Sequence, residues 1–279
     1  MMKSNPLISV IIPAYNEEKN IGNCLKTMLN QSYENIEIIV VDDGSSDKTL
    51  EFVKSFPVTL LNQKHGGPGK ARNLGSNKAK GEILVFMDAD MTFDKNFIKE
   101  LVLPIIDGQF KGAFSKEEYI SNWENVWSRC WNYNQNWPQK KMIPDDYPDE
   151  GLDFRAILKT EFEKVGGFDD VGYTDTWSLA HKLGYKPHSV KGAKYYHNNP
   201  DNLPEVFLQS KWASKRDYKF GLAGKLYALV RVSVFVSLIV GVLKAIKYKE
   251  PFFVVFKLVY DLGAFVGILE MMFFKKLSK

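Results

Sequence analysis

Two carboxylates stand two residues apart in the segment EILVFMDADMTFD. Asp88 and Asp90 directly follow the apolar run 83–87, whose length and composition are typical of a buried strand. Side chains alternate between the faces of a strand, so both carboxylates are expected to point the same way. Like charges this close repel each other unless a cation or a cluster of donors lies between them. The pair therefore predicts a Mg²⁺ or Mn²⁺ site, with an Asp-rich turn as the structural alternative.

The elements that must position this pair alternate between strand and helix patterns over residues 1–100. Continuous apolar runs predict strands at residues 8–12, 36–41, 58–61 and 83–87. Helices are predicted between them at residues 16–30, 46–55 and 68–80. Asn16 suits the cap of the first helix and Pro68 the start of the last. Continuous apolar strands separated by helices indicate a parallel sheet that is covered on both faces.

Polar segments follow three of these predicted strands. The first strand leads into PAYNEE, the second into DDGSSD and the fourth into DAD. In open α/β sheets, ligands bind beyond the carboxyl ends of the strands. Because all three segments fall at that edge, they predict a ligand-binding site there.

Aromatic and acidic side chains in the first two segments suit a nucleotide. Tyr15 offers a ring that can stack on a base or a ribose. Asp42 or Asp43 can accept hydrogen bonds from base or ribose donors, and one of the two is also expected to cap the DDGS turn. These residues predict a nucleotide-diphosphate ligand whose phosphates share a cation with Asp88 and Asp90.

The segment GGPGKARNLG carries two cations that could lie near such phosphates. Lys70 and Arg72 would add positive charge there, and the alternative is a solvated helix face. The segment is not a Walker phosphate loop, because it lacks the earlier glycine and the Ser or Thr after Lys70. No GxGxxG follows the first predicted strand, which disfavours a dinucleotide oxidoreductase, and neither a nucleophile elbow nor HExxH occurs.

Four motifs in the same order resemble glycosyltransferase family 2, whose fold is GT-A. They are SVIIPAYNEEKNIGNCL, IEIIVVDDGSSDKT, GKARNLGSNKAKGEILVFMDAD and FEKVGGFDD, and the match covers roughly residues 7–200. The resemblance implies an α/β, Rossmann-like GT-A fold with a mixed, mostly parallel sheet flanked by helices. It also implies transfer of a sugar from a UDP-, GDP- or similar nucleotide donor, with inversion at the anomeric carbon.

Carried over by position, the resemblance assigns several residues to the donor. Pro13, Tyr15, Glu17 and Asp43 would hold base and ribose, Arg72 would lie near the nucleotide, and Asp88 and Asp90 would form the DxD metal motif. His197, in YYHNNPDNL, stands where many family members also carry a His. A neutral imidazole could complete a Mn²⁺ site with the Asp pair, whereas a lone His is more often a structural hydrogen-bonder.

The family's catalytic base is expected after the GGFD motif. The segment GYTDTWSLAHKLGY has Thr174 where the family carries Glu, so Asp175 is the predicted base that deprotonates an acceptor hydroxyl. The structural alternative is a carboxylate favoured at a helix N-terminus. Asp169, Asp170 and Glu150 are the fallback residues. A lipid-phosphate acceptor is already ionised and would need no base.

An aromatic segment, YISNWENVWSRCWNYNQNW, lies in the second half of the match. Trp123, Trp127 and Trp131 recur at every fourth residue and so predict one face of a helix. Such a face suits sugar binding or a membrane interface. The alternative is an aromatic stripe that packs onto the sheet.

Charge is unevenly distributed along the chain. Residues 1–210 carry 24 Lys and Arg against 29 Asp and Glu, whereas residues 211–279 carry 13 against 4. A basic, apolar tail favours a membrane surface and not nucleic acid as the partner. With 45% hydrophobic and 14% aromatic residues, the composition excludes a disordered chain. Cys24 and Cys130 have no metal-like spacing and are predicted to be packing residues in a reducing compartment.

The tail contains two apolar stretches. Residues 226–243 are interrupted only by Arg231 and approach the roughly 20 residues that span a bilayer. The second stretch, 251–274, contains Lys257, Asp261 and Glu270, which are costly at the middle of a bilayer. We therefore expect amphipathic helices that lie in the cytoplasmic leaflet of the cell membrane. The alternative is a soluble dimerisation hairpin, which would make the protein a homo-oligomer.

Together these features predict a membrane-associated inverting glycosyltransferase. The expected domains are a GT-A domain at residues 1–210 and a helical membrane-association segment at 211–279. Residues 1–100 would form the nucleotide-binding half and 101–210 the acceptor-binding half. The acceptor would be a hydroxyl group on a glycan or a lipid-linked glycan. The alternatives are a polyprenyl-phosphate (dolichol-phosphate-type) glycosyltransferase and a non-catalytic nucleotide-sugar-binding membrane subunit.

Overall fold

The computed structural model describes residues 5–169, 175–216 and 218–274. These residues form two compact units. The first contains residues 5–119 together with Asp145–His197, and the second contains Ile120–Pro144 together with the described residues from Asn198 onward. By packing, the aromatic segment and residues 198–210 therefore group with the C-terminal helices, whereas the predicted division at residue 210 placed them with the sheet.

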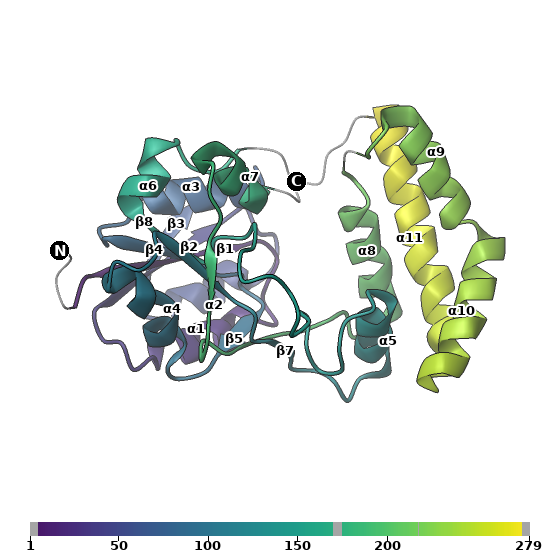
Figure 1. The fold of residues 1–279 in the computed structure, drawn as a ribbon, viewed down its shortest axis with the longest axis horizontal. Helices are drawn as coiled ribbons and strands as arrows, with labels where there is room; N and C mark the ends of the chain where they lie inside the picture. Colours follow the sequence, from purple (N-terminus) through teal and green to yellow (C-terminus); the bar gives the residue numbers. More distant parts are fainter. Residues whose placement is uncertain (1–4, 170–174, 217, 275–279) are drawn as a thin grey trace. The chain divides into compact units, whose positions relative to one another are not determined.

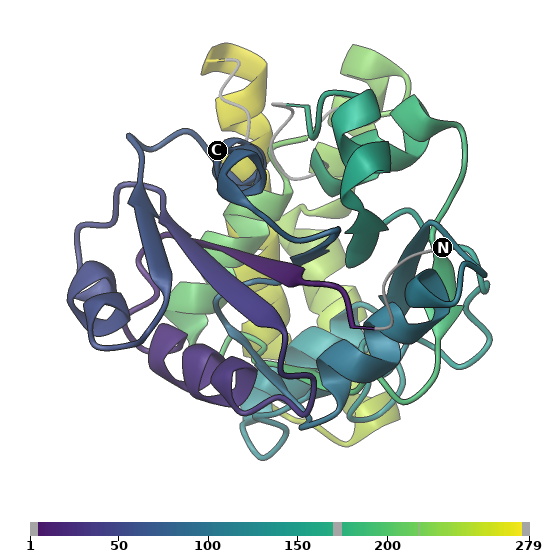
Figure 2. The same cartoon turned by 90° about the vertical axis from the view of Figure 1, so that its left-hand side faces the viewer.

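Seven strands form one sheet in the described part of the first unit, in the order β3-β2-β1-β4-β8-β6-β9 (Figure 2). They are β1 (Ile8–Ala14), β2 (Ile36–Asp42), β3 (Thr59–Asn62), β4 (Ile83–Phe86), β6 (Gly112–Ser115), β8 (Ala156–Leu158) and β9 (His188–Val190). The pairs β1/β2, β2/β3, β1/β4 and β6/β9 are parallel, and β8 runs antiparallel to β4 and β6. The sheet is mixed and mostly parallel, which confirms the prediction.

Helices cover both faces of this sheet (Figure 1). One face carries α1 (Ile21–Leu29), α2 (Thr49–Lys54) and α4 (Phe97–Ile106), and the other carries α3 (Pro68–Lys78), α6 (Lys159–Lys164) and α7 (Asp175–Leu183). All four residues of the central strand β4 are apolar and buried, because helices cover it from both sides.

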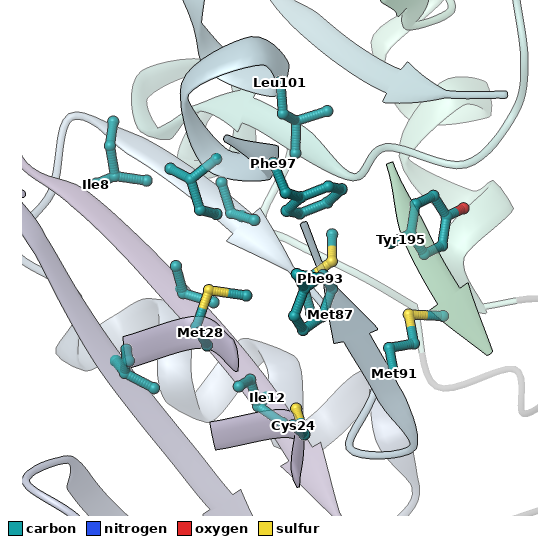
Figure 3. Packing of buried hydrophobic residues seen from close by; sticks show 14 of the residues in the cluster. Ile8, Ile12, Cys24, Met28, Met87, Met91, Phe93, Phe97, Leu101 and Tyr195 are labelled. Atoms are coloured by element: carbon teal, nitrogen blue, oxygen red, sulfur yellow. The ribbon is translucent and has the colours of Figure 1, made fainter. Parts of the chain in front are cut away.

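Apolar spacing explains how α1 packs on the sheet. Ile21, Cys24, Leu25 and Met28 recur every three or four residues and are all fully buried. Figure 3 shows Cys24 and Met28 among the packed apolar side chains. Asn16 does not cap this helix, so that prediction is wrong. It has a left-handed φ of 56°, and its side chain accepts the Ser46 backbone N–H at 2.8 Å. This bond joins the loops after β1 and β2.

A three-stranded sheet brings a distant segment to the end of β4. Its order is β5 (Met91–Phe93), β10 (Tyr195–His197) and β7 (Glu118–Ile120). β10 runs antiparallel to β5, and its register places His197 opposite Met91. Because Met91 follows Asp90 directly, this pairing positions His197 beside the acidic pair.

The second unit is helical. It contains α5 (Val126–Asn134), α8 (Leu203–Ala213), α9 (Gly221–Arg231), α10 (Val234–Tyr248) and α11 (Phe253–Phe274). Helices α8, α11 and α10 run side by side (Figure 1). Gly263 and Gly267 allow α11 to approach α8 closely, since a Cβ at either position would overlap the backbone of α8.

The tryptophans pack within this helical unit. Trp131 is buried, and its ring lies 5.3 Å from that of Tyr260 and 6.5 Å from that of Phe256, both in α11. Trp127 contacts Phe252 at 5.9 Å. Trp131 therefore packs onto α11, and Trp127 packs onto the residue before it. Trp123 precedes α5, so the predicted helical face holds only Trp127 and Trp131. The alternative that the stripe packs onto the sheet is wrong. Sequence spacing gives the apolar face of a helix but not its partner.

None of the described helices is, by itself, long and apolar enough to cross a bilayer. The apolar run at 226–243 is divided between α9 and α10, whose axes are bent by 58° relative to each other. Together the two helices have the length and composition of a membrane-spanning segment. The charges of α11 are paired inside the unit. Asp261 accepts from Lys257 and from Ser237 at 2.7 Å each, and Glu270 binds lysines of α8 and the segment after it.

Candidate active site

The carboxyl ends of β1, β2 and β4 meet at one edge of the larger sheet, as predicted. β1 and β2 pair so that Ala14 lies beside Asp42, and β4 pairs with β1 on its other side. The segments that leave these strands therefore bring Tyr15, Asp43 and Asp88 to the same edge. This edge is the candidate active site.

Asp42 and Asp43 are buried and fix the loops of this edge. The Asp42 carboxylate accepts the Ser45 backbone N–H at 3.3 Å, which caps the DDGS turn. The Asp43 carboxylate accepts the backbone N–H groups of Gly66 at 2.8 Å and Gly67 at 2.9 Å, which holds the loop before α3. Gly67 has a φ of 95°, a conformation that favours glycine. The expected contacts of the two carboxylates with base or ribose stay predictions.

Tyr15 stacks on His65, a residue that the sequence did not single out. The ring centroids are 4.1 Å apart with an angle of 23° between planes, and His65 Nδ1 lies 2.9 Å from Asp43 Oδ2. Tyr15 is 44% exposed, so the stack presents an aromatic surface to solvent at the sheet edge. Pro13 is half-buried near the end of β1, and Lys70 is exposed in the first turn of α3. Their predicted roles stay predictions.

Asp88 is held between two guanidinium groups from distant parts of the chain. Arg72 Nη2, on α3, donates to Oδ1 at 2.7 Å. Arg155 Nη1, on the residue before β8, donates to Oδ2 at 3.1 Å. Burial would raise the pKa of Asp88, but the two arginines hold it well below its usual range. Arg72 is buried, so the alternative of a solvated helix face is wrong for this residue.

Asp90 is bound through one oxygen. His197 Nε2 lies 2.8 Å from Asp90 Oδ2, and His197 Nδ1 lies 3.3 Å from Glu118 Oε1. Burial would lower the pKa of His197, but the two carboxylates raise it well above its usual range. The Tyr195 hydroxyl donates to Glu118 Oε2 at 3.0 Å and fixes that carboxylate. His197 thus links two carboxylates, and its role as a metal ligand stays a prediction.

Glu17 lies near the acidic pair. Its Oε2 accepts from Asn20 Nδ2 at 2.9 Å, and its backbone N–H donates to Thr49 Oγ1 at 2.7 Å. Burial and the nearby Asp90 carboxylate raise the pKa of Glu17 to about 7. Its predicted contact with base or ribose stays a prediction. The structure places Glu17 close enough to Asp88 and Asp90 for the three carboxylates to interact.

The surroundings of Asp90 fit one ligand to a divalent cation. In the described parts of the chain, no three His, Cys, Asp or Glu side chains form a complete metal site. Oδ1 of Asp90, however, is buried and has no hydrogen-bond partner among the described residues. A buried carboxylate oxygen costs free energy unless a donor or a cation contacts it. Asp90 can therefore offer a ligand of the type that Mg²⁺ and Mn²⁺ prefer, while both oxygens of Asp88 bind arginines.

The predicted base lies at the start of a helix. Asp175 is the first residue of α7, and its side chain lies outside the described part of the structure. The fallback residue Asp170 also lies outside the described residues. Asp169 is exposed and forms an ion pair with a lysine of α7 at 2.9 Å, and Glu150 is exposed and lies 3.5 Å from the imidazole at the start of β9. Asp175 stays the predicted base.

Arg155, Glu118 and His65 were missed by reasoning from the sequence. None of them lies in a recognisable motif, and each reaches the site through pairing between distant elements. The sequence held a weak signal for Arg155. A charged residue directly before the short apolar run AIL indicates where a buried strand begins. Nothing in the sequence marked Glu118 or His65.

The fold and the site define the class of protein. It is a mixed α/β protein of GT-A type, with polar side chains at the sheet edge where β1, β2 and β4 end. Comparison with known proteins gives the family. The model of Glycosyl transferase family 2 matches residues 9–166, more than half of the chain. The chain therefore belongs to glycosyltransferase family 2, which confirms the resemblance seen in its motifs.

Curated relatives are named as glycosyltransferases. The probable glycosyltransferase YdaM of Bacillus subtilis is 29% identical over 245 residues, which cover 78% of this chain and 57% of YdaM. Glycosyltransferase GlyG of Streptococcus pneumoniae is 42% identical over 101 residues, which cover 34% of each chain. The chain thus spans just over half the length of YdaM and a third of GlyG.

Solved structures share the fold. The mannosyltransferase PcManGT of Pyrobaculum calidifontis, in complex with GDP-Man and Mn²⁺, is 18% identical with a TM-score of 0.61, and the match covers 98% of this chain and 88% of that one. Staphylococcus aureus TarS 1–349 in complex with UDP is 17% identical with a TM-score of 0.55, and the match covers 98% of this chain and 93% of that one.

Proposed function

We propose that this protein is an inverting glycosyltransferase that moves a sugar from a UDP- or GDP-sugar to a hydroxyl group on a glycan or a lipid-linked glycan. The observation that carries this proposal is the grouping of Asp88, Asp90 and Arg72 at the carboxyl edge of a family 2 sheet. The GDP-Man in the PcManGT structure and the UDP in the TarS structure support the choice of donor.

Different side chains at this edge would contact the base, the ribose and the diphosphate of the donor. The exposed stack of Tyr15 on His65 offers an aromatic surface for the base. Pro13 and the loops held by Asp42 and Asp43 would border base and ribose. The guanidinium of Arg72 and the ammonium of Lys70 would attract the diphosphate.

A divalent cation, Mg²⁺ or Mn²⁺, would be held by Asp90 through its unpartnered Oδ1, with Asp88 and His197 as further candidate ligands. When bound, it would act as a Lewis acid that stabilises the departing diphosphate. The Mn²⁺ in the PcManGT complex supports this part of the proposal. Without a cation, the diphosphate would meet the carboxylate of Asp90 directly, and the like charges would weaken binding.

Transfer would proceed by direct displacement. The acceptor oxygen forms a bond to the anomeric carbon as the bond from that carbon to the diphosphate oxygen breaks, and Asp175 takes the hydroxyl proton. The position of Asp175 at the first residue of α7 is compatible with a carboxylate kept ionised by the helix dipole. Asp175→Asn should lower transfer about a hundredfold or more, because an amide cannot accept the proton. It should leave donor affinity unchanged, which titration with UDP and GDP would check.

The deciding experiment is a donor panel. The purified protein is incubated with UDP- and GDP-sugars and Mn²⁺, and released nucleotide is measured with and without EDTA. We expect turnover with at least one donor, dependent on the cation. Binding without turnover of any donor, in the presence of glycan acceptors, would instead favour the non-catalytic nucleotide-sugar-binding subunit.

A polyprenyl-phosphate acceptor is the second candidate, because the helical unit exposes a large apolar surface on which a lipid could lie. An ionised phosphate needs no base, so the two candidates differ in their response to Asp175→Asn. Transfer to a polyprenyl phosphate should survive this change, whereas transfer to a hydroxyl should not.

The same apolar surface supports association with a membrane. The exposed large apolar side chains of α9 and α10 are Leu222, Leu226, Tyr227, Val230, Val234, Phe235, Leu238, Ile239, Val242, Leu243 and Ile246. An exposed surface this apolar marks a membrane or a protein interface. We propose that α9 and α10 lie in the interface of the cytoplasmic leaflet, with their apolar side chains towards the acyl chains.

Charge supports this choice of partner. Each described acidic residue after position 217 forms an ion pair inside the helical unit: Glu250 with Arg129, Asp261 with Lys257, and Glu270 with Lys211 and Lys215. The cations Lys219, Arg231, Lys247 and Lys249 are exposed. The surface around the apolar side chains is thus basic, which suits anionic lipid headgroups.

Vesicle sedimentation tests the membrane proposal. We expect binding to phosphatidylcholine vesicles that contain phosphatidylglycerol, weaker binding without it, and loss of binding in Phe235→Asp. Leu103→Asp, at an exposed apolar position of α4 in the other unit, is the matched control and should bind normally. A wild-type dimer that Phe235→Asp converts to a monomer, with no vesicle binding in either form, would support the dimerisation alternative.

A further inference from the structure

The pairing of Asp88 with Arg72 and Arg155 has a consequence for the donor. The two guanidinium groups come from α3 and from the start of β8, and both direct N–H groups at one carboxylate. A carboxylate offers only two oxygens and a single negative charge, whereas a diphosphate offers more of both. Two guanidinium groups that converge on one anion are suited to bind a diphosphate in its place.

Exposure places Asp88 on the solvent side of this group. Its side chain is 32% exposed, against 7% for Arg72 and 13% for Arg155. An anion that approaches from solvent therefore meets Asp88 before it meets the guanidinium groups. Because the guanidinium groups expose little surface of their own, we expect the anion to reach them by displacing Asp88.

Both arginines have anchors apart from Asp88. Arg155 Nε lies 3.2 Å from Asp153 Oδ2, and its guanidinium lies 5.7 Å from the ring of Tyr195. The guanidinium of Arg72 lies 5.8 Å from the ring of Phe168. These contacts would keep the two side chains in place after Asp88 has left them.

We infer that Arg155 binds the donor diphosphate together with Arg72, and that Asp88 occupies the position of the diphosphate until the donor arrives. This inference rests on the proposed function, since it takes a nucleotide diphosphate as the ligand. It adds a binding residue that no motif marks, and it gives Asp88 a role in the donor-free protein that is separate from metal binding.

Binding of UDP and GDP in EDTA, measured by calorimetry, tests the inference without a metal. Arg155→Gln should weaken binding about tenfold or more, the value of a charge-assisted hydrogen bond. Asp88→Asn should tighten binding about threefold to tenfold, because the competing charge is removed. Arg155→Lys keeps the charge without the planar fork and should fall between wild type and Arg155→Gln.

A double variant separates direct binding from an effect through Asp88. If Arg155 contacts the diphosphate, Arg155→Gln should still weaken binding about tenfold in the Asp88→Asn background. If Arg155 only positions Asp88, its effect should vanish in that background, and the inference would be overturned. Asp88→Asn that leaves metal-free binding unchanged or weaker would also overturn it.

Controls address folding and the ligand class. Arg129→Gln breaks a comparable Arg–Glu pair in the other unit and should leave nucleotide affinity unchanged. Thermal unfolding of each variant shows that the fold is retained. Failure of the wild type to bind UDP or GDP even with Mn²⁺ would overturn the proposed function as well, whereas normal wild-type binding with unaffected variants would overturn only the role of Arg155.

Discussion

Asp261 of the helical unit and Asp90 of the sheet unit differ in how completely their carboxylate oxygens are paired. In the helical unit, Asp261 is 1% exposed and both of its oxygens accept hydrogen bonds, from Lys257 and Ser237. At the edge of the sheet, Asp90 keeps a buried oxygen without a partner among the described residues, and Glu17 has a raised pKa. The pairing of Asp261 is thus complete within the fold, whereas the unpartnered oxygen of Asp90 remains available to a ligand.

The largest expected effect is at Asp90. Asp90→Ala should lower metal-dependent transfer about a thousandfold, because a cation that stabilises the departing diphosphate contributes several kcal/mol. The melting temperature should change little, since His197 keeps Glu118 as a partner and the repulsion between Asp90 and Glu17 is removed. Release of nucleotide from the preferred donor with Mn²⁺, together with a thermal scan, measures both. Unaltered transfer would refute the metal role of Asp90.

Asp261 should show the opposite behaviour. Asp261→Ala leaves the buried ammonium of Lys257 without its carboxylate and should destabilise the helical unit by about 3 kcal/mol. Donor affinity should stay within about twofold of wild type, because Asp261 belongs to the other unit and shares no partner with the candidate site. Chemical unfolding and nucleotide titration measure the two quantities. Glu124→Ala, at an exposed acidic residue of the same unit, is the matched control and should stay within about 0.5 kcal/mol of wild type.

A change at Glu118 tests whether cation binding at Asp90 depends on neighbouring side chains. Glu118→Gln keeps the shape but removes the charge that holds His197, and it should weaken Mn²⁺ binding in the presence of nucleotide about tenfold. Electron paramagnetic resonance of free Mn²⁺ measures this affinity directly. An unchanged affinity, with the fold intact, would show that the pairing of His197 and Glu118 is structural only.

Glu17 gives the smallest effect and a distinctive pH dependence. The folded pKa of about 7 lies above the unfolded value of 4.5, so between these values the native state binds more protons than the unfolded state. Stability should therefore fall as pH rises through this window. Glu17→Gln removes the effect, so its stability relative to wild type should rise by about 1 kcal/mol per pH unit between pH 5 and pH 7, measured by chemical unfolding in EDTA.

Glu270 provides a control of opposite sign. Hydrogen bonds from Lys211 and Lys215 lower the pKa of Glu270, so its contribution to stability is present above its unfolded pKa and is lost as the pH falls. Glu270→Gln should therefore be more destabilising at pH 8 than at acidic pH. If both variants changed with pH in the same direction, the contrast between the two units would be refuted.

Much of the first unit followed from local patterns. Continuous apolar runs predicted β1, β2, β3 and β4, and the prediction that α3 begins at Pro68 is confirmed. The DxD pair fell at the end of β4, where the pattern placed it. Such features are readable because strand and helix periods, proline geometry and turn chemistry depend on neighbouring residues only.

Contacts between distant elements were not readable in this way. Sequence alone established the strands, the acidic edge and the family, whereas only the tertiary structure placed Arg155 on Asp88, Glu118 behind His197 and the tryptophans against α11. It also paired the charges of α11, which the sequence presented as breaks in an apolar run. The reason is physical: a residue's type and spacing fix which face of its element it occupies, but its partner depends on how strands register and helices pack across the whole chain.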